Sequence, residues 1–202
     1  MTADRNWHVL LVGGPSGTGK SSACAALLRR YEIGTAEIDD LDAAVRAMTT
    51  PEQQPALHYW SQHADTEEWT AERILEVTVS AARAFEPALR AVVAAHLDNG
   101  PPVIMEGDFV LPALLGTEPL TGPEVRAVFV YEPDEAQLVA NYAGREPASG
   151  AQLMRARVSY LFGQRLVAES ARLGVPVLPA RPWDTLPDRI HAAAAIERPV
   201  GS

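Results

Sequence analysis

Short apolar runs recur along the chain and are separated by longer amphipathic segments. The first of these runs, residues 8–12 (HVLLV), is continuously apolar after its histidine. Runs of this kind are typical of strands that are buried on both faces of a parallel sheet. Similar runs predict four further strands, so that the five predicted strands lie at residues 8–12, 35–38, 103–105, 125–130 and 175–178.

Helical spacing of apolar residues predicts the segments between these strands to be helices. The predicted helices lie at residues 21–31, 65–99, 134–142, 151–173 and 186–195. Asp65 and Glu68 form a capping-box pair at the start of the second helix, and Pro87 should break or kink it. Asp134 is expected to cap the third helix and Gly174 to end the fourth. Strands that alternate with helices in this way predict an α/β domain with a parallel sheet covered on both faces.

The length, net charge and cysteine content of the chain limit the classes of function that it can have. The 202 residues suit one domain, and the net charge of −9 disfavours a duplex nucleic-acid binder, which needs a basic face. No apolar run reaches the roughly 18–20 residues that span a bilayer, and the first residues lack a signal-peptide pattern. The single cysteine, Cys24, excludes an internal disulfide and is expected to lie in the core. We therefore expect a cytoplasmic protein with no membrane partner, and the sequence allows a homodimer.

The strongest motif is Gly-Pro-Ser-Gly-Thr-Gly-Lys-Ser at residues 14–21, which matches the phosphate-binding pattern G-x-x-x-x-G-K-[ST] at every position. A predicted strand precedes it and a predicted helix follows. Glycines let the backbone curl around phosphate oxygens, Lys20 reaches the β- and γ-phosphates, and the Ser21 hydroxyl is a ligand for Mg²⁺. The motif predicts ATP and Mg²⁺ as cofactors. The residues expected to bind the nucleotide are Gly14, Ser16, Gly17, Thr18, Gly19, Lys20, Ser21 and Ser22.

The chain lacks both the Asn-Lys-x-Asp guanine reader of GTPases and the Leu-Ser-Gly-Gly-Gln signature of transporter ATPases. The phosphate loop, two strands ending in acids, a helical insertion and an arginine-bearing segment together resemble the nucleoside-monophosphate-kinase-like group. Within that group the chain is most similar to small-molecule kinases of the chloramphenicol phosphotransferase, zeta toxin, gluconate kinase and 2-phosphoglycerate kinase types. The resemblance implies a single P-loop NTPase domain with sheet order 2-3-1-4-5. It also implies an acceptor-binding insertion near residues 41–99 and a lid near residues 143–160.

Four acidic residues follow predicted strands, where ligands bind in open α/β sheets. The resemblance implies that Asp39 takes the proton of the acceptor hydroxyl, with Asp40 as its substitute. Asp40 is also well placed to cap a helix that starts at Leu41. Glu106 stands where many P-loop proteins carry an aspartate that holds Mg²⁺, so we assign it to the metal. Asp108 is expected to contact the acceptor.

Arginines between the fourth and fifth strands are expected to offset the negative charge of the transferred phosphate. Arg145 is the first choice and Arg155 the second, while Arg157 lies two positions from Arg155 and cannot share its helix face. After the last strand, Arg181 or Trp183 is expected to stack on the nucleobase. A loop that leads into the last helix, capped by Asp184 or Thr185, would explain these residues equally well.

The predicted insertion contains Tyr59 and Trp60, which are expected to bind the acceptor, although aromatic residues there would equally suit a small hydrophobic cluster. The resemblance favours an ATP-dependent kinase that phosphorylates a hydroxyl of a small molecule. A kinase of nucleotides or polynucleotide 5′ ends and a nucleotide-binding regulator without transfer activity are the alternatives. The residues do not identify the acceptor.

Overall fold

A five-stranded parallel sheet forms the centre of the molecule. The computed structural model describes residues 5–63, 69–144 and 150–196. The strands are β1 (Val9–Gly13), β2 (Gly34–Glu37), β3 (Val103–Gly107), β4 (Val125–Tyr131) and β5 (Val177–Pro179). All neighbouring strands pair in parallel, in the order β2-β3-β1-β4-β5. The predicted strands and their spatial order are therefore confirmed.

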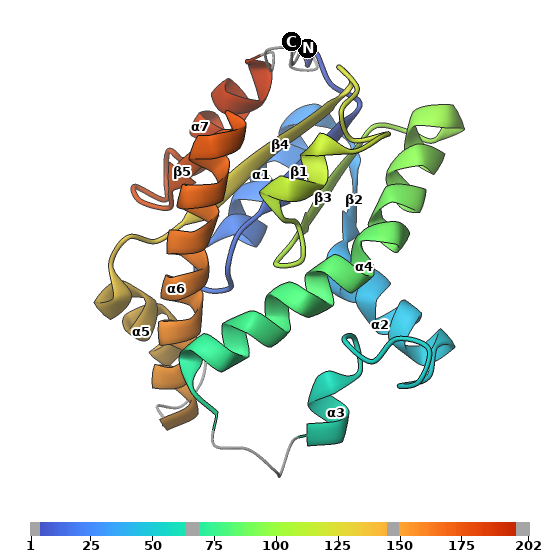
Figure 1. The fold of residues 1–202 in the computed structure, drawn as a ribbon. Coiled ribbons are helices and arrows are strands. Elements are labelled where there is room, and N and C mark those ends of the chain that lie inside the picture. The colour runs from blue at the N-terminus through green and yellow to red at the C-terminus, as the bar shows by residue number, and fades with distance from the viewer. Residues whose placement is uncertain (1–4, 64–68, 145–149, 197–202) are drawn as a thin grey trace.

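Helices cover both faces of the sheet (Figure 1). They are α1 (Lys20–Tyr31), α2 (Ile38–Met48), α3 (Tyr59–His63), α4 (Ala71–Asn99), the 3₁₀ helix η1 (Pro112–Gly116), α5 (Glu135–Ala143), α6 (Gly150–Leu173) and α7 (Leu186–Ala195). The Asp134 side chain caps α5 by accepting a hydrogen bond from the Ala136 N–H, as predicted. Gly174 follows α6 with φ 62°, which is the left-handed conformation expected of a glycine at a helix end.

Two hydrophobic cores lie on opposite faces of the sheet, because successive strand residues point to opposite sides. Val9 and Leu11 of β1 pack with α4, η1 and α6 on one face. Leu10 and Val12 pack with α1 and α7 on the other. Cys24 belongs to the second core, where burial raises the pKa of its thiol to about 12, so the thiol stays protonated at neutral pH. Its predicted place in the core is confirmed.

The register of the strands brings the candidate residues to one edge of the sheet. Gly13 at the end of β1 pairs with Gly107 of β3 and Phe129 of β4, and Glu37 of β2 pairs with Glu106. The phosphate loop therefore begins beside the acids that follow β2 and β3.

Helix α2 begins earlier than the sequence indicates. Its cap residue is Glu37 and its first residue is Ile38, so Asp39 and Asp40 both lie in its first turn, and the expected cap at Asp40 is wrong. The reason is a core contact: Ile38 is fully buried, and a Cβ on Gly107 would lie only 2.6 Å from the Ile38 Cβ. Because Ile38 packs this closely against Gly107, helix α2 follows directly after β2 with no loop between them.

Helix α4 continues through Pro87 instead of breaking there. Figure 1 shows this helix bending about midway along its length, which is the kink expected where proline removes a helical hydrogen bond. Its first residue is Ala71, and the Thr70 side chain caps it by accepting a hydrogen bond from the Arg73 N–H. Asp65 and Glu68 lie outside the described residues.

Among the helices that the structure describes, none combines the length and apolar character that crossing a bilayer requires.

Candidate functional site

The loop between β1 and α1 has a backbone that requires glycine. Gly14, Gly17 and Gly19 have φ angles of 147°, 85° and 87°. At Gly14 an added Cβ would lie 2.2 Å from the carbonyl oxygen of Val130 on β4. The Thr18 hydroxyl donates a hydrogen bond of 3.0 Å to the Pro15 carbonyl and closes the loop on itself. We call residues 14–22 the phosphate cradle.

The cradle leaves its backbone donors without acceptors. Within the described part of the chain, the N–H groups of residues 16–22 make no hydrogen bond to a protein acceptor. Gly19 is the cap residue of α1, and no side chain caps that helix end. Buried backbone N–H groups are nearly always paired, and an open helix N-terminus carries a partial positive charge. This row of donors is therefore suited to an anion with several oxygen atoms.

Lys20 is the only lysine in this sequence, and its side chain is 7% exposed. Its Nζ lies 2.6 Å from Oδ1 of Asp108 and 4.0 Å from Oε2 of Glu106. The other carboxylate oxygen of Asp108, Oδ2, accepts a hydrogen bond of 2.9 Å from the Ser16 hydroxyl. Burial acts to lower the pKa of Lys20, but Asp108, Glu106 and Asp39 together raise it above its ordinary value. The ammonium group therefore stays charged across the physiological range.

Three carboxylates surround this one ammonium group. Asp39 in the first turn of α2 interacts electrostatically with Lys20, Asp108 and Glu106. Partial removal of water raises the pKa of the Asp39 carboxyl, and repulsion by Asp108 adds to this rise, whereas Lys20 opposes it. A carboxylate whose pKa is raised is a better proton acceptor, as the expected role of Asp39 requires.

The raised pKa of Asp39 gives a direct prediction. In a carboxyl ¹³C NMR titration of the ligand-free protein, the Asp39 midpoint should lie above 3.8, the value of an unperturbed aspartate. The folded state holds this proton more tightly than the unfolded state, so the Asp39 contribution stabilises the fold as the pH falls through the raised pKa. In Asp108→Asn the midpoint should move down, because one of the repelling charges is gone. A midpoint at or below 3.8 in the parent protein would contradict the arrangement.

Oxygen donors at the cradle fit Mg²⁺ better than a soft metal. The predicted ligands are the exposed hydroxyl of Ser21 and the carboxylate of Glu106, whose side chain is 12% exposed. The described residues contain no group of three or more His, Cys, Asp or Glu side chains that could hold a metal ion by themselves. This donor set suits Mg²⁺, which uses one or two protein ligands and completes its coordination with phosphate oxygens and water.

A cavity of about 490 Å³ adjoins the cradle on the side of α5. Its volume lies in the range of small-molecule sites. Trp183 forms part of its wall, and the indole N–H donates a hydrogen bond of 3.2 Å to the Thr18 carbonyl. A Cβ on Gly19 would lie 3.2 Å from the Trp183 ring, so the ring lies directly against the cradle. The lining residues are Gly17, Gly19, Ser22, Ala23, Ala140, Asn141, Gly144, Trp183 and Pro187.

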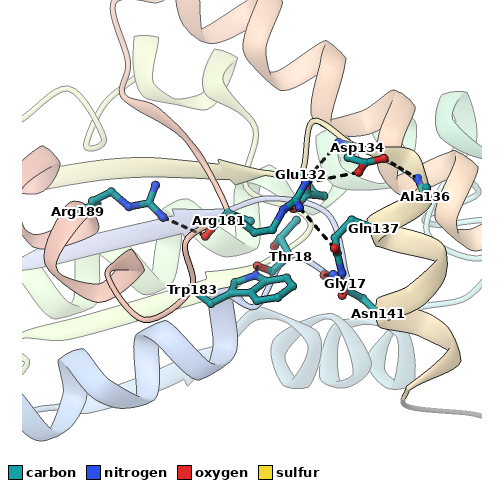
Figure 2. Close-up of polar contacts among 11 residues, drawn as sticks. Gly17, Thr18, Glu132, Asp134, Ala136, Gln137, Asn141, Arg181, Trp183 and Arg189 are labelled. Atoms are coloured by element: carbon teal, nitrogen blue, oxygen red, sulfur yellow. Dashed lines mark hydrogen bonds and ion pairs between the residues drawn. The ribbon is translucent and has the colours of Figure 1, made fainter.

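Arg181, the other residue expected to stack on a base, is held by carboxylates instead (Figure 2). It donates hydrogen bonds of 2.9 and 2.8 Å to the two oxygens of Glu132, whose side chain is completely buried. Of the two residues expected to stack on a base, Trp183 is thus the one that lines the cavity.

A chain of polar side chains connects Arg181 to the cradle, as Figure 2 shows. Arg181 donates to Gln137 at 3.4 Å, Gln137 donates to Asn141 at 2.9 Å, and Asn141 donates to the Gly17 carbonyl at 2.8 Å. Sequence reasoning missed Glu132, Gln137 and Asn141. The position of Glu132 just after β4 was the available signal, since polar residues that follow parallel strands gather at the ligand-binding edge.

The structure distinguishes Arg155 from Arg157, two of the arginines expected to meet the transferred phosphate. Arg145 lies outside the described residues. The Arg155 guanidinium lies 4.8 Å from the centre of the Tyr142 ring, and that ring would lie 3.4 Å from a Cβ on Gly17. Arg157 pairs with Glu135 of α5 at 2.8 Å. Arg155 is therefore one ring away from the cradle, whereas Arg157 forms an exposed ion pair with α5.

The aromatic residues of the insertion contact one another. The rings of Tyr59 and His63 stack at 4.0 Å, those of Trp60 and Trp69 lie 4.5 Å apart, and Arg73 donates a hydrogen bond to the Tyr59 hydroxyl. These residues form a half-buried cluster between α3 and the start of α4. Such a cluster is the alternative to acceptor binding that the sequence allows. A role of Tyr59, Trp60 and Asp40 in binding the acceptor stays a prediction.

Comparison with solved structures identifies the fold. A gluconokinase from Sinorhizobium meliloti 1021 superposes with a TM-score of 0.53 at 17% sequence identity, over 95% of this chain and 94% of that one. TT1252 from Thermus thermophilus gives a TM-score of 0.48 at 15% identity, over 93% and 95% of the two chains. The PezAT toxin–antitoxin system of Streptococcus pneumoniae gives 0.46 at 12% identity, over 95% and 78%.

The likeness to the gluconokinase covers nearly the whole chain and confirms the P-loop kinase-like fold that the sequence resemblance implied. No protein-family model matches the sequence. No match was found among curated proteins either.

Proposed function

We propose that this protein is an ATP-dependent phosphotransferase that moves the γ-phosphate of ATP to a hydroxyl group of a small molecule. The observation that carries the proposal is the cradle itself, where the N–H groups of residues 16–22 lack protein acceptors beside the buried ammonium of Lys20. Such a row of donors at an uncapped helix end suits the phosphates of a nucleotide. The shared fold with a protein named as a gluconokinase supports small-molecule kinase chemistry.

The cavity beside Trp183 is the proposed site of the nucleoside. It is continuous with the cradle through Gly17 and Gly19, so a base in the cavity and phosphates on the cradle would belong to one ligand. The Asn141 side chain donates to Gly17 and accepts from Gln137, which leaves the indole face of Trp183 as the main recognition surface. Stacking on a ring binds any base, and we infer that adenine is held mainly by this contact.

In the proposed reaction, an oxygen of the acceptor hydroxyl bonds to the γ-phosphorus, while the bond from that phosphorus to the oxygen bridging the β-phosphate breaks. Asp39 accepts the hydroxyl proton. Lys20 and Arg155 offset the negative charge that spreads over the transferred group. Ser21 and Glu106 would hold Mg²⁺, which when bound shields the phosphate oxygens.

The acceptor side offers little positive charge to a nucleic acid. Residues 41–99 contain four arginines, of which Arg83 is exposed on α4. The other three have acidic neighbours: Arg46 pairs with Asp42, Arg73 with Glu76, and Arg90 with Glu86. Because three of the four guanidinium groups are already engaged locally, the region offers no stripe of positive charge that could follow a phosphate backbone. The charges therefore support a small acceptor over a polynucleotide 5′ end.

Turnover assays test the proposal. Mg·ATP is incubated with the protein and a panel of hydroxylated metabolites, and ³¹P NMR follows the products. We expect ADP and one new phosphomonoester signal with members of a single compound class. Stoichiometric ATP binding without ADP release across the whole panel would instead support a regulatory nucleotide-binding protein.

Removal of the Trp183 ring should weaken nucleotide binding selectively. Stacking of a base on an aromatic ring contributes about 1–3 kcal/mol, so Trp183→Ala should weaken ADP binding about 5- to 150-fold. Pyrophosphate, which has no base, should bind as it does to the parent protein. Isothermal titration with both ligands measures the difference. Leu173→Ala, which also shortens an exposed apolar side chain, serves as the control. Equal losses for ADP and pyrophosphate would place the base elsewhere.

A further inference from the structure

We propose that Asp108 determines which anions the phosphate cradle accepts. In the ligand-free protein its carboxylate binds two polar side chains of the cradle, Ser16 and Lys20, so a simple anion such as inorganic phosphate is excluded unless it displaces that carboxylate. The inference rests on the proposed function, since it concerns the same cradle, and it adds a selectivity that a phosphate loop alone does not have.

The geometry shows a bridging carboxylate. Oδ1 of Asp108 lies 2.6 Å from the Lys20 ammonium and Oδ2 lies 2.9 Å from the Ser16 hydroxyl, so each oxygen has its own donor. Glu106, at 4.0 Å from Lys20, is beyond hydrogen-bond distance. Asp108 is thus the one of these two acids that binds the cradle directly. It comes from the chain just after β3, the strand that pairs with β1, and the cradle follows β1.

A carboxylate and a phosphate offer the same kind of charged oxygen acceptor. Any anion that approaches Lys20 therefore competes with Asp108, and it is also repelled by Asp108, Glu106 and Asp39. The Lys20 side chain is only 7% exposed, so little water can screen this repulsion.

The number of phosphate groups in the ligand determines whether it can displace the Asp108 carboxylate. A single phosphate can reach only part of the cradle, and its gain is offset by the loss of the two Asp108 hydrogen bonds. A polyphosphate spans more of the free N–H groups of residues 16–22 and gains enough hydrogen bonds to displace the carboxylate. Asp108 would in this way keep the cradle empty of inorganic phosphate while admitting nucleotides.

The test measures anion binding to the full chain with EDTA present, so that any role of Asp108 toward a metal is removed. Orthophosphate and pyrophosphate are titrated calorimetrically into the parent protein, Asp108→Asn and Asp108→Ser. Loss of a hydrogen bond between charged groups should change orthophosphate affinity about ten- to a hundredfold, and we expect tighter binding in both variants. Circular dichroism confirms that the titrated variants are folded, and the two replacements guard against a defect peculiar to one of them.

Glu37→Gln is the matched control. Glu37 carries the same charge on the neighbouring strand, yet it makes no hydrogen bond or ion pair with the cradle residues that the structure describes. An equal rise in affinity in Glu37→Gln would mean that net charge alone is responsible and would overturn the inference. Unchanged or weaker orthophosphate binding in the Asp108 variants would overturn it as well. Binding of Mg·ADP to the parent protein separates the two proposals. If the parent protein does not bind Mg·ADP, the proposed function is wrong as well. If it binds Mg·ADP, only the inference about Asp108 is wrong.

Discussion

Replacing Lys20 with methionine is expected to slow phosphoryl transfer by about a hundred- to a thousandfold, the usual cost of losing one group that stabilises transition-state charge. Methionine keeps the length and apolar character of the lysine stem, but it has no ammonium group to meet the γ-phosphate. It also leaves Asp108, Glu106 and Asp39 facing the nucleotide without a neutralising cation. The apparent KM for Mg·ATP should therefore rise as well.

ADP release measured with the acceptor found by the metabolite panel tests this expectation. Arg30→Met is a suitable control, because Arg30 lies on the same helix and pairs with Asp188 at the surface. Exposed pairs of this kind contribute little to stability, so Arg30→Met should behave as the parent protein does. Transfer by Lys20→Met at the parent rate would remove the basis for the proposed function.

Replacing Gly14 with alanine is expected to destabilise the fold by about 3 kcal/mol or more, because an unusual φ and a backbone collision act together. Gly14 has φ 147°, and its Cβ would lie 2.2 Å from the Val130 carbonyl oxygen. This oxygen belongs to the backbone of β4, which is paired on both sides and cannot shift without breaking the sheet. For a chain of this size, the loss corresponds to a fall in Tm of roughly 6–12 °C.

Thermal unfolding followed by circular dichroism measures the change. The matched control is Gly34→Ala, at the start of edge strand β2, where an added Cβ meets nothing within 4 Å. Alanine there should be neutral, or stabilising by up to about 1 kcal/mol, because it restricts the unfolded chain. Similar melting of Gly14→Ala and the parent protein would contradict the loop geometry described above.

Local patterns of the sequence were sufficient to locate the strands, most helices and the cradle. A strand that is buried on both faces requires a continuous apolar run. The cradle requires glycines at the positions where φ is positive. Both requirements can be recognised from a few consecutive residues of the sequence. The caps at Asp134 and Gly174 were found for the same reason, since each satisfies groups within a few residues of itself. The sheet order came from the family resemblance, because runs of apolar residues do not specify their neighbours.

Contacts between distant segments could be decided only by the tertiary structure. The predicted contact of Asp108 with the acceptor stays a prediction. That Asp108 lies against Lys20, 88 residues away, follows only from the pairing of β1 with β3. The sequence offered both Arg181 and Trp183 as contacts of the base, and only the structure shows that Arg181 pairs with the buried Glu132 while the Trp183 ring lies against Gly19. The sequence by itself located the cradle that is proposed to bind phosphate, since the cradle is built from consecutive residues. Which side chains surround it depended on strand register and packing, which no short stretch of residues encodes.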